Sequence, residues 1–208
     1  MYNFKDQHIY LVTDDSNFDF ETLCEKIESS ILGGTSIVQL REKHSSSLAF
    51  YNHALKIKEI CKKHKVIFII NDRLDIAQAV DADGVHLGQS DLPLIVARKI
   101  LGQEKIIGIS AKTKESAIQA ENDGADYIGV GAVFPTNTKK DAQYITKEEF
   151  LKIRKIINIP IYSIGGINID NAKEIIEYRS SGIAISSAIL NTKDSKKATS
   201  DFKKLFLK

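Results

Sequence analysis

The sequence has 208 residues, with 29 Lys and Arg against 27 Asp and Glu and a formal charge of +2. This near balance excludes the broad positive field with which proteins coat nucleic acids, and no apolar run reaches the roughly 18 residues of a membrane span. Cys24 and Cys61 lie among apolar residues at helical spacing, which favours buried thiols and a reducing compartment. We therefore expect one cytoplasmic domain over residues 1–208 that binds neither nucleic acid nor membrane.

Short apolar runs alternate with amphipathic segments along the chain, which is the pattern of β–α units. The apolar runs predict strands at residues 9–13, 36–40, 66–70, 84–87, 106–109, 127–130, 160–164 and 182–185. Apolar residues at helical spacing after each run predict helices within residues 20–31, 50–61, 74–80, 91–101, 114–122, 146–157, 172–176 and 198–206. Residues 66–70 are apolar throughout, which is typical of a strand covered on both faces in a parallel sheet.

Four of the expected helix ends carry sequence signals. Residues 33–34 are glycines and end the first helix, where a left-handed backbone is favoured. Residues 45–47 are serines that can cap the second helix, and Asp91 is a candidate cap for the fourth. Thr146 and Glu149 have the spacing of a capping box, which places the start of the sixth helix.

Eight strand-and-helix units in 208 residues are close to the minimum for a closed barrel. We therefore predict the α/β class and a single (β/α)8 TIM barrel. The alternative is an open doubly wound sheet, but no Gly-x-Gly-x-x-Gly turn follows the first strand. In a barrel the residues that follow the strands gather on one rim. That rim would hold Arg41, Lys43, Asn71, Asp72, Asp91, Ser110, residues 136–139, Gly165, Gly166, Ser186 and Ser187.

The end of the second strand concentrates polar groups on one side. In an extended segment successive side chains point to opposite faces, so Gln39, Arg41 and Lys43 share one side. Leu40 and Glu42 take the opposite side, where Glu42 would support its basic neighbours. A guanidinium, an ammonium and an amide together suit a diphosphate better than a single carboxylate. Spacing alone leaves a second interpretation open, which is a strand end whose charges face water.

Two further rim clusters suggest anion and metal binding. Gly166, Ser186 and Ser187 follow strands seven and eight, where barrels often bind phosphate through backbone N–H groups. The alternative for the glycine is a tight turn. Asp72 and Asp91 are a candidate Mg²⁺ pair, because Mg²⁺ takes oxygen ligands from one or two carboxylates. The alternatives are a helix cap at Asp91 and an ion pair between Asp72 and the arginine that follows it.

Other polar residues favour structural roles. His86 lies in the fourth expected strand without a nucleophile or a second metal-binding histidine nearby, which favours a hydrogen-bonded structural imidazole. Residues 14–15 are two aspartates after the first strand, for which a solvated loop is favoured over a second acidic site. No part of the sequence supports a Ser-His-Asp triad.

Eight short segments form an ordered pattern along the chain. They are Tyr10-Leu11-Val12-Thr13-Asp14, Gln39-Leu40-Arg41-Glu42-Lys43, Asn71-Asp72-Arg73, Asp83-Gly84-Val85-His86-Leu87-Gly88-Gln89 with Asp91, Gly108-Ile109-Ser110, Gly129-Val130-Gly131 continuing to Phe134-Pro135-Thr136-Asn137-Thr138-Lys139, Ile164-Gly165-Gly166-Ile167, and Ser187-Ala188-Ile189. The ordered set resembles the thiamine phosphate synthase family over nearly the whole chain.

The resemblance implies a barrel that joins 4-amino-5-hydroxymethyl-2-methylpyrimidine diphosphate to 4-methyl-5-(2-phosphoethyl)thiazole, releasing pyrophosphate and forming thiamine phosphate. The implied partners are these small molecules, and a homo-oligomer is compatible with the sequence. The implied pyrimidine diphosphate site comprises Gln39, Leu40, Arg41, Glu42, Lys43, Asn71, Ser110 and Lys139. The implied thiazole phosphate site comprises Thr136, Asn137, Thr138, Gly166, Ser186 and Ser187. The implied cofactor is Mg²⁺ on Asp72 and Asp91, and the implied catalytic residues are Arg41, Lys43, Ser110 and Lys139.

The family reaction is expected to be dissociative. The CH₂–O bond ionises, charged groups neutralise the departing diphosphate, and the thiazole nitrogen then adds. Residues 131–143 would form a lid that shields the cation from water. Related thiazole tautomerases share the barrel, and a non-catalytic binding protein of the same pathway is a third interpretation. The intact segments 39–43 and 134–139 argue against both.

Three positions depart from the family pattern. Ala132 stands where proline is frequent, Asp81 stands where glycine is common, and residues 179–181 replace a small, glycine-containing approach to the last strand. None of these positions coincides with an implied ligand.

Overall fold

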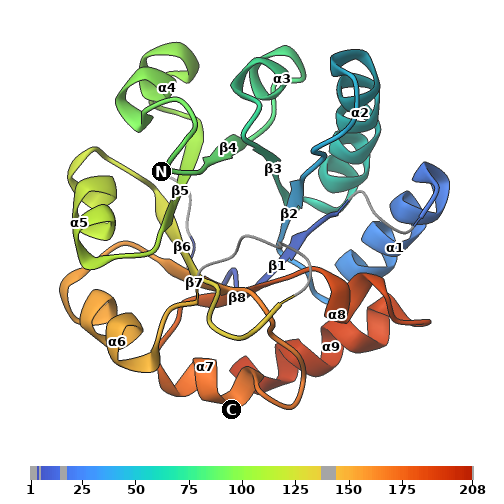
Figure 1. Ribbon diagram of the computed structural model, residues 1–208. Coiled ribbons are helices and arrows are strands. Elements are labelled where there is room, and N and C mark those ends of the chain that lie inside the picture. The colour runs from blue at the N-terminus through green and yellow to red at the C-terminus, as the bar shows by residue number, and fades with distance from the viewer. Residues whose placement is uncertain (1–3, 5, 15–17, 137–143, 208) are drawn as a thin grey trace.

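The computed structural model describes residues 4, 6–14, 18–136 and 144–207. Within them, eight parallel strands form a closed barrel in the order β1 to β8, and β1 also pairs with β8 (Figure 1). Helices surround the barrel on the outside of the strands (Figure 1). The predicted single (β/α)8 barrel is therefore confirmed.

Each strand is short and is followed by a helix, and two helices follow the last strand. The strands are β1 (Ile9–Val12), β2 (Ile37–Leu40), β3 (Ile67–Asn71), β4 (Gly84–Leu87), β5 (Ile106–Ala111), β6 (Tyr127–Gly131), β7 (Ile161–Ile164) and β8 (Gly182–Ile185). The helices are α1 (Phe20–Gly33), α2 (Ser47–His64), α3 (Leu74–Ala79), α4 (Leu94–Leu101), α5 (Lys114–Asn122), α6 (Lys147–Ile156), α7 (Ala172–Glu177), α8 (Ser187–Leu190) and α9 (Ser195–Phe206).

The hydrophobic core has one layer on each side of the strands. The larger layer lies between the strands and the helices, contains Leu11 and Val38, and includes both cysteines as buried free thiols. The smaller layer fills the barrel and contains Tyr10, Tyr127 and Tyr162. Their rings pack edge to face with centroids 5.3, 5.4 and 5.8 Å apart. The alternation of side chains along each strand produces these two layers.

Three of the four predicted helix-end signals are used. Gly34 is the C-cap of α1 with a φ of 114°, a left-handed backbone that suits glycine. The hydroxyl of Ser46 accepts a hydrogen bond from the backbone N–H of Ala49 at 3.2 Å and so caps α2. Thr146 and Glu149 form the predicted capping box at the start of α6. Local polar chemistry therefore sets these helix boundaries.

One expectation about helices was wrong, and one helix was not expected. Asp91 does not cap a helix, because α4 begins at Leu94 after Pro93 and the Asp91 carboxylate accepts the N–H of Gly88 at 2.6 Å instead. The short helix α8 was not predicted, because a four-residue helix has too few turns to produce a periodic apolar pattern. This short helix begins at Ser187, directly after the last strand.

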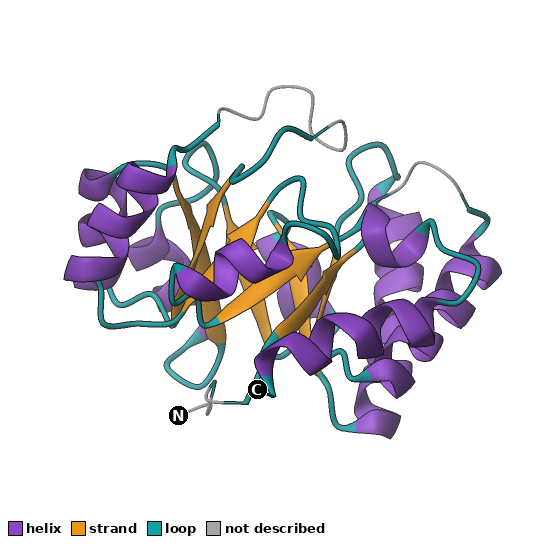
Figure 2. Cartoon of the chain, turned by 90° about the horizontal axis from the view of Figure 1, so that it is seen from below, coloured by secondary structure: helices purple, strands orange, loops and turns teal. Residues whose placement is uncertain are grey.

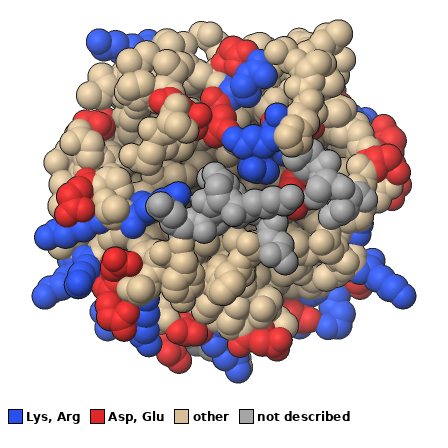
Figure 3. Space-filling view, in the orientation of Figure 1, with Lys and Arg blue, Asp and Glu red and all other residues tan. Residues whose placement is uncertain are grey.

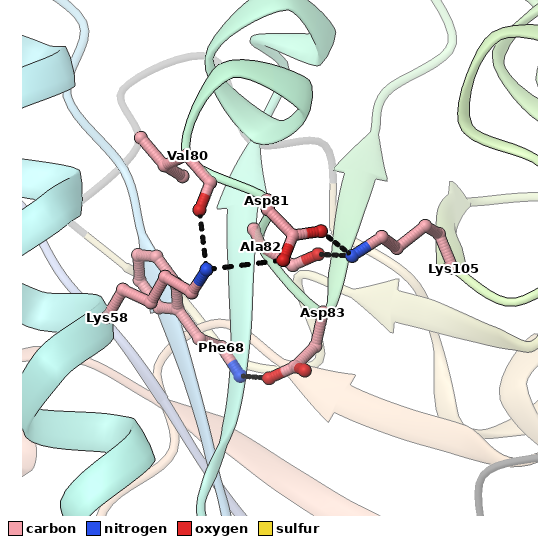
Figure 4. A network of polar contacts seen from close by, with 7 residues as sticks. All are labelled: Lys58, Phe68, Val80, Asp81, Ala82, Asp83 and Lys105. Carbon is pink, nitrogen blue, oxygen red and sulfur yellow. Dashed lines mark hydrogen bonds and ion pairs between the residues drawn. The ribbon is translucent and has the colours of Figure 1, made fainter.

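Two departures from the family pattern fall where the backbone is left-handed. The angle φ is 50° at Asp81 and 58° at Arg179, which is the region that favours glycine. The ammonium groups of Lys58 and Lys105 donate hydrogen bonds to the Asp81 carboxylate and to two neighbouring carbonyl groups (Figure 4). These contacts hold the turn between α3 and β4 at the N-terminal end of the barrel.

The two ends of the barrel are distinct in the side view. Figure 2 shows both termini at one end and long loops at the opposite end. Because the strands are parallel, the loops that follow them share this opposite end, which is the rim on which the candidate site was predicted. No helix in the described part of the chain has both the length and the apolar character needed to cross a membrane.

Candidate active site

The rim where the strands finish brings together polar side chains from several strands. Gln39 lies in β2 and is followed by Arg41 and Lys43, while β3 ends at Asn71 directly before Asp72. Figure 3 looks onto this end and shows basic and acidic side chains side by side near the middle of the face. Barrel topology alone therefore predicted where these residues would meet.

Two carboxylates and one ammonium form the charged centre of this rim. The Lys43 ammonium donates to Asp72, and the carboxyl groups of Asp72 and Asp91 lie within hydrogen-bond reach of each other. The guanidinium of Arg73 turns away and donates to Asp75 at 2.8 and 2.6 Å. Both structural alternatives, a helix cap at Asp91 and an ion pair within residues 72–73, are therefore absent here.

The proximity of the two carboxylates shifts their proton affinities. Desolvation raises the pKa of Asp91, and the adjacent Asp72 carboxylate raises it further, although the N–H of Gly88 lowers it. Desolvation also acts on Asp72, but hydrogen bonds to the side chains of Lys43 and Asp91 bring the pKa of Asp72 below its ordinary value. The two carboxylates therefore occupy one site and compete for positive charge.

This donor set fits Mg²⁺. The ion prefers hard oxygen ligands, and one or two carboxylates commonly hold it while water and phosphate oxygens complete the octahedron. In the described ranges, no three or more His, Cys, Asp and Glu side chains gather as an all-protein metal site. A cation held by Asp72 and Asp91 would therefore take its remaining ligands from substrate and solvent.

Side chains inside the barrel form hydrogen bonds with two other candidate substrate-binding residues, Gln39 and Ser110. The amide nitrogen of Gln39 donates to the Tyr10 hydroxyl at 2.6 Å, and Nε2 of His86 lies 2.9 Å from the Ser110 hydroxyl oxygen. His86 is thus the hydrogen-bonded imidazole that the sequence favoured. Asn71 is 9% exposed at the end of β3, so only its tip reaches the rim.

Arg41 is positioned by a residue that the sequence analysis did not single out. The Thr13 hydroxyl accepts the Arg41 N–H at 2.9 Å and lies 3.3 Å from the Arg41 carbonyl oxygen, to which it donates. Thr13 is 1% exposed and follows β1, the neighbour of β2 in the barrel. Its place in the Tyr10-Leu11-Val12-Thr13-Asp14 segment was the available signal, but its partner could be identified only once the strands were paired.

Two residues of the implied pyrimidine site have side chains that face elsewhere. Leu40 is completely buried between the barrel and the helices. The Glu42 carboxylate, whose side chain is 5% exposed, lies 2.7 Å from Nδ1 of His53, and the His53 ring stacks on Phe20. Alternation along the segment turns both side chains away from the side of Gln39, so the implied substrate contacts of Leu40 and Glu42 stay a prediction and would have to use their backbone groups.

The loops after β6, β7 and β8 lie together on the same rim. The N–H of Phe134 donates to the Gly165 carbonyl at 3.1 Å. Gly166 has a φ of 66°, and a Cβ there would lie 2.3 Å from the Pro135 carbonyl oxygen, so close packing between the loops requires this glycine.

The far side of this loop cluster carries the two serines. The Ser186 hydroxyl donates to Asp14 at 3.0 Å, and Ser187 is exposed at the start of α8. Thr136 is half-buried at the edge of the same cluster. The remaining implied residues, Asn137, Thr138 and Lys139, lie outside the described residues.

A closed barrel with basic groups, a carboxylate pair and glycine-rich loops on its C-terminal rim defines an enzyme of the (β/α)8 class that acts on small anionic molecules. The comparisons with known proteins identify the family within this class. The family model described as thiamine monophosphate synthase matches residues 9–189. The chain belongs to this family, as the ordered segments predicted.

Individual relatives agree with the family match. A thiamine-phosphate synthase from Clostridium beijerinckii is 50% identical over 203 residues, covering 98% of this chain and 97% of the relative. One from Clostridium acetobutylicum is 51% identical over 186 residues, covering 89% and 88%. The solved structure of a thiamine phosphate pyrophosphorylase from Pyrococcus furiosus superposes with a TM-score of 0.89 at 37% identity and covers 97% of this chain and 96% of that one.

Proposed function

We propose that the protein condenses 4-amino-5-hydroxymethyl-2-methylpyrimidine diphosphate with 4-methyl-5-(2-phosphoethyl)thiazole to form thiamine phosphate and pyrophosphate. Membership of the family and full-length similarity to thiamine-phosphate synthases support this reaction. The observation that carries the proposal is the contact of Lys43 with Asp72 and of Asp72 with Asp91. This mixture of charges suits a reaction in which a diphosphate bound to a metal ion is the leaving group.

The basic residues would act on the leaving diphosphate. Arg41 and Lys43 would neutralise the charge that develops as the CH₂–O bond of the pyrimidine substrate breaks. Ser110 would donate a hydrogen bond to the same group, and Lys139, outside the described residues, completes the proposed catalytic set. The cation left on the pyrimidine is stabilised by resonance, and the thiazole nitrogen then adds to its CH₂ carbon. No nucleophilic side chain is required.

The carboxylate pair would hold the metal. Asp72 and Asp91 are proposed to bind Mg²⁺, which when bound supplies positive charge that offsets the negative charge of the diphosphate. In the structure the Lys43 ammonium partly neutralises Asp72. Once substrate binds, Lys43 would exchange this carboxylate for a phosphate oxygen. The pair and its lysine therefore form a site prepared for a metal diphosphate.

The thiazole phosphate would lie on the loops after β6, β7 and β8. Gly166, Ser186 and Ser187 are proposed to bind it with Thr136, and Asn137 and Thr138 belong to the proposed site by family resemblance. The close approach of the glycine turn to Pro135 supports a joint site, because it fixes these loops relative to one another. We further propose a cytoplasmic location, which the buried free cysteines support.

A two-substrate assay tests the proposal. The full chain is supplied with both substrates and Mg²⁺, and thiamine phosphate is measured by chromatography. Product should form, and an excess of chelator should stop its formation until Mg²⁺ is restored. If a folded protein makes no product, the proposal is wrong, and isomerisation of the thiazole precursor without the pyrimidine substrate would instead identify a tautomerase.

A further inference from the structure

A continuous line of hydrogen bonds crosses the inside of the barrel from one candidate ligand to another. It begins at Gln39, whose amide nitrogen donates to Tyr10 at 2.6 Å, and the hydroxyl oxygens of Tyr10 and Tyr127 are 2.6 Å apart. From Tyr127 it continues to Nδ1 of His86 at 3.0 Å, and from Nε2 of His86 to the Ser110 hydroxyl at 2.9 Å. The line therefore joins β2, β1, β6, β4 and β5.

The barrel interior makes room for these rings. Gly108 faces Tyr127, because a Cβ at Gly108 would lie 2.1 Å from the Cζ atom of the tyrosine. Similarly, a Cβ at Gly129 would lie 3.1 Å from Cε1 of His86, and the rings of His86 and Tyr127 stack with centroids 5.5 Å apart. Two positions in neighbouring strands thus lack side chains where the line passes. The arrangement is more specific than general interior packing.

The protons along this line can be placed one by one. Burial raises the pKa of both Tyr10 and Tyr127 far above neutral, so each hydroxyl keeps its proton. The Tyr10 oxygen accepts a hydrogen bond from Gln39, so the Tyr10 proton needs an acceptor elsewhere. Among the described residues the Tyr127 oxygen is the acceptor within reach. Because leaving a buried donor unpaired is costly, Tyr10 donates to Tyr127.

The same argument places the protons between Tyr127 and the rim. Since Tyr127 accepts from Tyr10, its own proton goes to Nδ1 of His86. A neutral His86 must then carry its proton on Nε2, from which it donates to the oxygen of Ser110. Among the described residues the Ser110 hydroxyl oxygen then has His86 as its partner, and the Ser110 proton is available to a ligand.

We infer that Tyr10, Tyr127 and His86 are positioning residues, which hold His86 in the Nε2–H tautomer and thereby present Ser110 as a hydrogen-bond donor to bound substrate. At the opposite end, the Gln39 amide commits its nitrogen to Tyr10 and keeps its carbonyl oxygen as an acceptor. One end of the line therefore offers a hydrogen-bond acceptor, and the other end offers a donor.

This polarity suits a ligand with an amino donor at one end and an anionic oxygen at the other. An aminopyrimidine diphosphate has both, so the inference rests on the proposed function and deepens it. The Gln39 end would accept from the amino group, and Ser110 would donate to an oxygen of the diphosphate. Hydrogen bonds fixed in advance of the reaction favour the charge that develops as the diphosphate leaves.

Two matched tyrosine variants test the role of the line. Tyr127→Phe removes the proton donor to His86 and keeps the buried ring. Tyr162→Phe is the control, because Tyr162 packs against the same rings but its hydroxyl donates to the Gln7 carbonyl at 2.7 Å, outside the line. Tyr127→Phe loses two hydrogen bonds, with Tyr10 and with His86, whereas Tyr162→Phe loses one, so Tyr127→Phe should be the less stable variant and kcat is compared on the folded proteins. We expect kcat to fall about tenfold in Tyr127→Phe with little change in KM, and to stay within about twofold in Tyr162→Phe.

The tautomer gives a readout that needs no activity. Protein labelled with ¹⁵N at histidine reports by NMR which ring nitrogen carries the proton, and His86→Gln assigns the His86 signals. We expect the Nε2–H tautomer in the ligand-free wild type and in Tyr162→Phe, and a loss of this preference in Tyr127→Phe. A proton on Nδ1 in the wild type, or a folded Tyr127→Phe with wild-type kcat, would overturn the inference. Failure of the wild type to make thiamine phosphate would count against the proposed function, while the tautomer would still test the line of hydrogen bonds.

Discussion

The two ends of the barrel use charge in opposite ways. At the N-terminal end, carboxylates are surrounded by donors. Asp83 accepts the N–H of Phe68 at 2.8 Å, and Asp126 accepts the N–H of Ile107 at 2.8 Å and the guanidinium of Arg98 at 2.7 Å. Together with the lysine pair on Asp81, shown in Figure 4, these contacts tie strand starts to neighbouring loops. Charge at this end therefore stabilises the fold.

At the C-terminal rim, carboxylates face each other. Asp72 and Asp91 lie side by side with Lys43 as a shared cation, and the pKa of Asp91 is raised by desolvation and by its neighbour. Placing like charges together opposes folding, whereas the pairs at the opposite end favour it. The difference indicates that the rim is arranged for a ligand, because only added positive charge would satisfy both carboxylates.

The largest expected effect concerns Asp91 at the C-terminal rim, where a loss of activity without a loss of stability would distinguish the rim from the N-terminal end. Asp91→Asn keeps an oxygen that can accept the Gly88 N–H and removes the like-charge contact with Asp72. We expect thiamine phosphate formation to fall about a hundredfold or more, because a proposed metal ligand is lost, while the melting temperature stays the same or rises. Steady-state kinetics and thermal unfolding measure the two effects. A folded variant with normal turnover would remove Asp91 from the metal site.

The same substitution at the opposite end should have the reverse outcome. Asp126→Asn weakens the contacts to Arg98 and to the N–H of Ile107. We expect a loss of about 2 kcal/mol in the free energy of unfolding and no change in kcat. Urea titration and the two-substrate assay measure these quantities. A large loss of activity without a loss of stability would contradict the assignment of a purely structural role to this end of the barrel.

A smaller effect concerns the left-handed residue before β8. Arg179 has a φ of 58°, so Arg179→Gly relieves an unfavourable backbone at an exposed position. We expect the free energy of unfolding to rise by about 0.5 kcal/mol, because the relief of steric strain exceeds the entropic cost of glycine. Arg179→Ala keeps the constraint and serves as the control. Equal stability of the two variants would show that backbone relief is not the cause.

The smallest effect is a pH dependence in the outer helix layer, in a cluster that includes the last two residues of α2. The Glu28 carboxylate lies 2.7 Å from His64 Nε2 and 2.7 Å from Lys63 Nζ, and these hydrogen bonds lower the pKa of Glu28 from its ordinary value to about 2. Because the folded-state pKa lies below the unfolded-state value, Glu28 stabilises the fold above about pH 4.5, and this contribution is lost as the pH falls toward about 2.

Glu28→Gln provides the matched comparison. The wild type should be slightly more stable than this variant at pH 6, and the two should converge as the pH falls toward 2. Since the Glu28 side chain is 35% exposed, solvent screens the interaction and the difference should be modest. Chemical unfolding at several pH values measures it, and a difference that persists unchanged at pH 2 would contradict the assigned ionisation.

The sequence predicted the barrel because its strands are local features. Runs such as residues 66–70 and 182–185 are apolar and bounded by polar turns, so each could be found without knowledge of its partners. Alternation likewise separated Gln39 from Leu40, and the structure confirms that their side chains lie on opposite faces of the sheet.

What the sequence missed depends on contacts between distant residues. The bond between Tyr10 and Tyr127 joins positions 117 apart, and the support of Arg41 by Thr13 depends on the pairing of β1 with β2. No periodic pattern encodes such partners. Asp91 was ambiguous for a related reason, since a helix cap and a metal ligand need the same residue type at nearly the same place.

The most direct test of the account is whether the carboxylate pair on the rim makes the reaction depend on Mg²⁺. Thiamine phosphate formation by the full chain is measured with both substrates across a Mg²⁺ titration, for the wild type and for Asp91→Asn. The account predicts saturable activation of the wild type, loss of product in excess chelator, and a requirement for much more Mg²⁺ or no activity in the variant. Equal Mg²⁺ dependence of the two proteins, or full activity of the wild type in chelator, would contradict it.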